Sequence, residues 1–142
     1  MLFRSFTLLP PAQTIPYPPY DSGVVAAVGT TFREDEVIAS DIPWAVAWYA
    51  DRTAVWAPFE RSDYIAINDN IRAIAGIYLT QATPMSMTVP EAWGSYQIFW
   101  TRNFRPPSDW RPPDPQFPLQ YWRPVSLDGL QVLLANRPHW PL

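Results

Sequence analysis

Proline is the residue that most restricts how this chain can fold, because its ring fixes the backbone φ angle and removes a backbone hydrogen-bond donor. The sequence contains 18 prolines, and most of them lie toward its two ends. Between Asp21 and Thr80 there are only Pro43 and Pro58. We therefore expect most of the regular helices and strands within that window.

The window alternates strand patterns with helical patterns. Strands are predicted at Glu36–Ser40, Thr53–Trp56 and Ile74–Leu79, and a fourth beyond the window at Leu130–Ala135. Helices are predicted from Asp21 or Ser22 to Thr31, from Pro43 to Tyr49, and from Ser62 or Asp63 to Arg72. The strands are continuous apolar runs, which is typical of strands covered on both faces. The pattern predicts a small Rossmann-like α/β domain with a mainly parallel sheet of about four strands and helices on both faces.

The proline-rich segments set the limits of this domain. Residues 1–20 are expected to form either a free linker or a strap on the surface, packed by Tyr17 and Tyr20. Residues 21–142 are expected to form one domain, because no repeat or second core is visible. A helix is expected at Trp93–Arg102, and the segment from Phe104 to Pro118 is too rich in proline for regular structure.

Composition excludes several classes of function. The net charge is −3, so no basic face for nucleic acid is implied. The chain has no Cys or Lys, one His (His139) and five glycines, and it has neither a nucleophile elbow nor a glycine-rich phosphate loop. We therefore predict no catalytic residue, metal site or cofactor within the chain. No run of residues approaches the length of a membrane span.

Candidate binding residues follow from the expected sheet. In open α/β sheets, ligands bind beyond the carboxyl ends of the strands. Asp41 and Arg137 are the charged residues predicted at those ends, and either could bond a sugar or a phosphate. Alternatively, Asp41 caps the following helix and Arg137 pairs with a carboxylate. Trp44 is the aromatic candidate for stacking on a sugar ring.

Aromatic content is the most unusual feature of the composition, with eight Trp residues. Burial is the favoured interpretation for Trp44, Trp48 and Trp56, because they lie within regular elements. Four others lie in less regular segments and are candidates for an exposed binding patch. These are Trp93, Trp110, Trp122 and Trp140.

The segment DIPWAVAWYADRTAVWAP, from Asp41 to Pro58, resembles a segment in the soluble C-terminal tails of polytopic bacterial membrane proteins. The similar proteins are of the dolichyl-phosphate-mannose-protein mannosyltransferase type, within the GT-C glycosyltransferases. The similarity continues through IAGIYLT (Ile74 to Thr80), FPL (Phe117 to Leu119) and LANRPHW (Leu134 to Trp140). It covers most of the chain after Tyr17.

This resemblance implies a non-catalytic accessory domain of a membrane-bound enzyme that uses a lipid-phosphate-linked sugar donor. The domain would lie on the periplasmic face of the inner membrane, tethered by upstream membrane spans, and would cover the active site or hold the acceptor. Its partners would be the membrane-embedded part of the same polypeptide and a glycan or other acceptor. The catalytic carboxylate of that family lies in an early loop that matches no position here. The alternative is an independent module that binds carbohydrate or protein.

Overall fold

The computed structural model describes residues 18, 20–58, 60–80, 82, 115–125 and 131–137. Among these residues the helices are α1 (Ser22–Gly29), α2 (Pro43–Tyr49) and α3 (Arg61–Asn70). The strands are β1 (Val37–Ser40), β2 (Thr53–Trp56), β3 (Ile74–Leu79), β4 (Tyr121–Pro124) and β5 (Val132–Ala135). The first three strands and all three helices lie where the sequence predicted them, within one or two residues at most ends.

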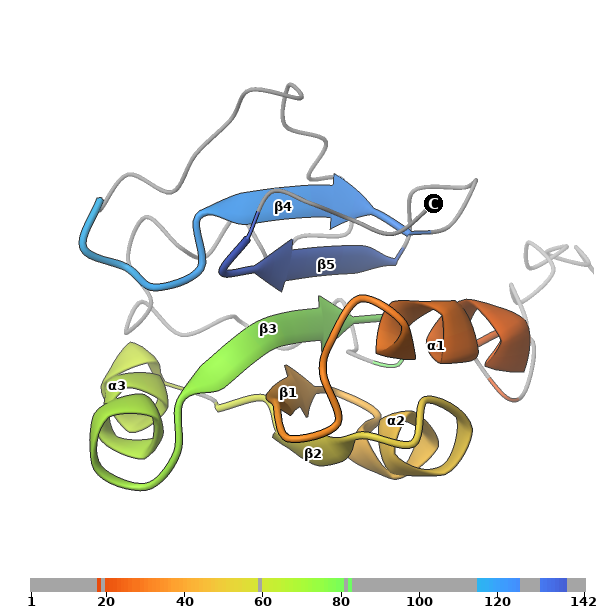
Figure 1. Cartoon of the computed structure of the whole chain (residues 1–142), viewed down its shortest axis with the longest axis horizontal. Helices are drawn as coiled ribbons and strands as arrows, with labels where there is room; N and C mark the ends of the chain where they lie inside the picture. The colour runs from red at the N-terminus through yellow and green to blue at the C-terminus, as the bar shows by residue number, and fades with distance from the viewer. Residues whose placement is uncertain are drawn as a thin grey trace, which may run out of the picture.

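The strands form one sheet in the order β2-β1-β3-β5-β4 (Figure 1). β1 pairs in parallel with β2 and β3, whereas β5 is antiparallel to both β3 and β4. Four strands therefore run in one direction and β5 opposes them. The chain is a small α/β domain, as predicted.

Two details of the predicted sheet were wrong. The strand ending at Ala135 is antiparallel to β3 and β4, because β5 follows β4 too soon in the sequence for the long crossover that parallel neighbours need. β4 itself was not predicted, and its last residue is Pro124. β4 is at the edge of the sheet, where proline is tolerated.

Helices cover both faces of the sheet, as expected for strands that are apolar throughout. α1 and α2 pack on one face over a core that includes Val25, Val46, Ile38 and Tyr78. α3 and the segment around Phe117 cover the other face. Neighbouring strand residues alternate between the two cores, since successive side chains of a strand point to opposite faces.

Local chemistry explains where the helices begin and how closely they pack. The Asp21 carboxylate accepts hydrogen bonds from the N–H groups of Gly23 and Val24 and so caps α1, as predicted. At the other end, a Cβ on Gly29 would lie 2.6 Å from the Ala50 carbonyl oxygen. α1 and α2 can approach this closely only because residue 29 has no side chain.

Several predictions fall outside the described residues. They concern the helix at Trp93–Arg102, most of the strap at residues 1–20, His139, and the side chains of Trp93, Trp110, Trp122 and Trp140. Tyr20 is described, and it packs against the α1 and α2 core with its ring 6.2 Å from that of Tyr49. No helix in the described part of the chain is long and apolar enough to cross a membrane.

Candidate functional site

We call the side of the sheet where the parallel strands end the carboxyl edge. There the connections diverge between β1 and β3, which makes this place the topological switch point of the sheet. The chain leaves β1 through α2 to β2 on one side, and returns through α3 to β3 on the other. Ligands of open α/β sheets bind in the crevice at such a point. Here the Asp41 carboxylate, which follows β1, occupies the position facing the end of β3.

Asp41 is bonded to Thr80, the residue that follows β3. The Thr80 N–H lies 3.1 Å from Oδ1 and 3.0 Å from Oδ2 of Asp41, and Thr80 Oγ1 donates to Oδ2 at 3.0 Å. Thr80 Oγ1 also accepts from the N–H of Ala82. Thr80 is buried and Asp41 is half-buried. The carboxylate therefore ties together the segments that follow β1 and β3, which an open crevice would keep apart.

The alternative role predicted for Asp41, capping α2, is not what the structure shows. The residue before the helix is Ile42, and no side chain caps it. The Ile42 N–H bonds instead to Ser40 Oγ at 3.1 Å. Pro43 at the start of α2 removes one N–H that a cap would serve. The Asp41 carboxylate instead reaches across to Thr80, the residue after β3.

A second buried polar contact lies next to this bridge. Tyr78 donates a hydrogen bond through its hydroxyl to Gln131 Oε1 at 2.5 Å. Burial raises the pKa of Tyr78, and the negative charges of Asp41 and Asp21 raise it further. Neither Tyr78 nor Gln131 was predicted as a site residue. The sequence feature that could have indicated this pair is a polar group in an otherwise apolar run: Tyr78 in IAGIYL and Gln131 in QVLLA.

Arg137 lies at the amino ends of the parallel strands, whereas Asp41 lies at their carboxyl ends. Because β5 is antiparallel, its carboxyl end lies beside the amino ends of β1 and β3. There the Arg137 guanidinium is bonded to the buried Glu36 carboxylate. Glu36 also accepts from the Arg33 N–H at 2.8 Å. The structure therefore separates Arg137 from Asp41, and it pairs with a carboxylate as the alternative interpretation stated.

Trp44, Trp48 and Trp56 are exposed, so the favoured prediction of their burial was wrong. Their exposed fractions are 53%, 82% and 63%. The inner face of α2 is made by the small residues Ala45 and Val46, so the tryptophans point outward. Regular spacing within an element did not reveal which face of α2 would be covered.

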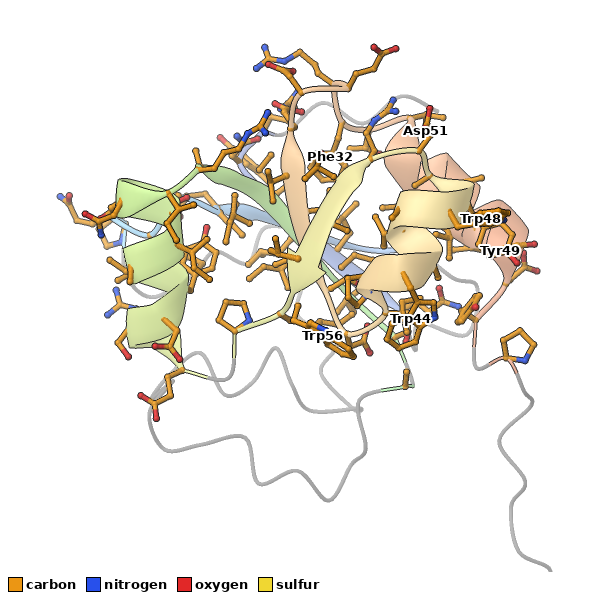
Figure 2. All side chains as sticks on the ribbon, turned by 90° about the horizontal axis from the view of Figure 1, so that it is seen from below. Phe32, Trp44, Trp48, Tyr49, Asp51 and Trp56 are labelled. Carbon is orange, nitrogen blue, oxygen red and sulfur yellow. The ribbon has the colours of Figure 1, made fainter. Side chains whose placement is uncertain are left out.

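Together with Tyr49, these tryptophans form what we call the aromatic surface (Trp44, Trp48, Tyr49 and Trp56). Figure 2 shows three of the side chains projecting from α2 and Trp56 at the end of β2. The rings of Trp44 and Trp56 lie 5.3 Å apart, edge to face. Trp44 is the one candidate residue that is both near Asp41 in the chain and open to solvent.

At the carboxyl edge, the Asp41 carboxylate is bonded to the hydroxyl groups of Ser40 and Thr80, and Trp44 follows three residues later in the chain. Within the described residues, no cluster of three or more His, Cys, Asp or Glu residues has the arrangement of a metal site. The polar side chains at the edge bond to one another. The accessible chemistry is that of a contact surface made of indole and phenol rings.

Comparisons with known proteins give no family for the chain. No protein-family model, no curated protein and no solved structure matches it.

Proposed function

We propose that the chain is a non-catalytic accessory domain of a larger membrane-bound glycosyltransferase. The observation that supports this role is the aromatic surface, where three tryptophans and a tyrosine stand exposed on α2 and β2. Clustered exposed apolar groups of this kind mark contact sites. Trp and Tyr rings combine an apolar body with a polar tip, which suits a contact near a membrane or a sugar.

In this proposal the aromatic surface contacts the membrane-embedded part of the same polypeptide at the periplasmic face. The domain covers the active site or holds the acceptor, while the transfer from the lipid-linked donor takes place elsewhere in the protein. The internal bonding of Asp41 to Thr80 is consistent with a structural carboxyl edge.

Fractionation of the source cells tests whether the chain belongs to a larger membrane protein. Antibodies raised against the purified 16.3 kDa chain should detect a much larger polypeptide in the membrane fraction. A band at the mass of the chain alone, in the soluble fraction, would overturn the proposal.

Within that larger protein, the aromatic surface can be tested by substitution. Trp44→Ala with Trp48→Ala should lower sugar transfer from the lipid-linked donor without changing the melting temperature of the domain. Ile71→Ala is the matched control, because Ile71 is a large apolar residue with 78% exposure at the end of α3, away from the aromatic surface. Equal activity of the two variants would contradict the assigned role.

An independent carbohydrate-binding module is the second candidate, favoured by the exposed pair Trp44 and Trp56. In that case the isolated chain should bind soluble oligosaccharides, with a change in tryptophan fluorescence. Binding should be lost in Trp44→Ala and kept in Ile71→Ala. If the isolated chain binds no oligosaccharide, this candidate is excluded.

A further inference from the structure

Among the residues that the structure describes, no strand pairs with the outer side of β2, at one long edge of the sheet. In the described sheet β2 is the terminal strand, and its described partner is β1. Figure 2 looks onto this edge, where β2 lies in front of β1, with α2 to one side and α3 to the other. No described element pairs with the outer side of β2.

The register of β1 and β2 shows which backbone groups point outward. The Ala57 N–H donates to the Ser40 carbonyl at 2.8 Å, so the backbone N–H and C=O groups of residue 57 point toward β1. The backbone groups of successive residues in a strand point alternately to the two sides, so those of Val55 and Thr53 also point toward β1. The N–H and C=O groups of Ala54 and Trp56 therefore point away from the sheet.

These outward groups are arranged to pair with a copy of themselves. In an antiparallel pair with Val55 opposite Val55 of the second copy, Ala54 lies opposite Trp56. Each such pair of residues exchanges two hydrogen bonds, since both present N–H and C=O toward the other strand. Every outward group of Ala54 and Trp56 is then satisfied, and the arrangement is symmetric about a twofold axis at Val55.

The side chains fit the same register. Opposite residues of an antiparallel pair place their side chains on the same face. Trp56 therefore lies beside the methyl group of Ala54 from the second copy, so a large ring meets a small side chain. β2, with the sequence TAVW, has no charge, proline or bulge of the kind that natural edge strands use to prevent pairing.

We infer that two copies of this chain pair through β2 and form one continuous sheet across a twofold axis. The axis is perpendicular to the sheet, so both α2 helices lie on the same face and the aromatic surfaces of the two copies adjoin. Twofold symmetry is the commonest form of homo-oligomer. This pairing is independent of any role in glycosyl transfer, and an oligomer measurement on the isolated chain tests it alone.

The first test is the mass of the chain in solution, by light scattering or sedimentation over a range of concentrations. The wild type should approach twice 16.3 kDa as concentration rises. Ala54→Pro should remain at the mass of one chain. Proline at residue 54 removes an outward N–H and no bond to β1, so circular dichroism and the melting temperature should stay near those of the wild type.

The second test uses the absence of cysteine from the sequence. Residues that are opposite but not hydrogen-bonded lie about 4.5 Å apart at Cα, within the range that a disulfide spans. Val55→Cys should therefore form a covalent dimer under mild oxidation, seen on a non-reducing gel. Ala66→Cys, on the exposed side of α3, should not. This test stands even if Ala54→Pro fails to fold.

A wild type that stays at the mass of one chain at every concentration overturns the inference. A wild-type dimer in which Val55→Cys forms no more cross-link than Ala66→Cys overturns it equally, because the contact then lies on another surface.

Discussion

Replacing Asp41 with alanine tests whether the bridge to Thr80 holds the carboxyl edge together. The substitution removes the acceptor for the Thr80 N–H and Oγ1, both bonded at 3.0–3.1 Å. A hydrogen bond to a charged group contributes about 1.5–3 kcal/mol, and a buried N–H without a partner costs about 1–3 kcal/mol. Water can reach the half-buried site of Asp41 and recover part of this loss. We expect the free energy of unfolding to fall by about 3 kcal/mol.

Equilibrium unfolding in urea, followed by tryptophan fluorescence, measures this loss. With a urea dependence of about 2 kcal/mol per M, the midpoint should fall by about 1.5 M. Asp41→Asn keeps one oxygen for the Thr80 N–H and should lose about half as much. Asp63→Ala, an exposed carboxylate in the first turn of α3, should change stability by about 0.5 kcal/mol.

A double-mutant cycle with Thr80→Val isolates the side-chain part of the bridge. Valine keeps the N–H and the shape of residue 80 but removes Oγ1, so the coupling with Asp41→Ala should be about 1 kcal/mol. If Asp41→Ala stays within about 0.5 kcal/mol of the wild type, the carboxylate does not fasten the two strands. Asp41 would then again be a candidate for binding a ligand.

Two other perturbations follow from the packing. Gly29→Ala places a methyl group 2.6 Å from the Ala50 carbonyl oxygen and should lower the free energy of unfolding by about 2–3 kcal/mol in a thermal or urea melt. Gly23→Ala is the control, because its methyl group meets only the movable Asp21 side chain, and it should change stability by less than about 1 kcal/mol. Equal effects of the two substitutions would show that α1 and α2 are not in tight contact. Burial raises the pKa of Tyr64 and of Tyr78, so the folded state keeps protons that the unfolded chain releases above pH ~10. The free energy of unfolding should therefore be at its full value below pH ~10. Above that pH it should fall by about 1.4 kcal/mol per pH unit for each of the two tyrosines. Tyr78→Phe should remove about half of this slope, and an unchanged slope would refute the assignment.

The sequence alone determined the order and position of most elements between Asp21 and Leu79. These depend on interactions within a few residues: Asp21 caps α1, Pro43 begins α2, and continuous apolar runs make β1 and β3. The α/β class follows from the alternation of those elements. Local signals of this kind are visible in one sequence because the residues that interact are neighbours in it.

Only the tertiary structure decided the direction of β5, the partner of Asp41 and the exposure of the tryptophans. Asp41 meets a residue 39 positions away, and Arg137 meets Glu36 across 101 positions. Contacts at such separations depend on how strands are ordered in the sheet, which no local pattern specifies. The small residues Ala45 and Val46 of α2 suffice to cover β1 and β2, so its large rings remain outside. Which face of a short helix is buried is decided by what packs against it, because a helix of seven residues with apolar side chains all around has no single polar side to mark the outside.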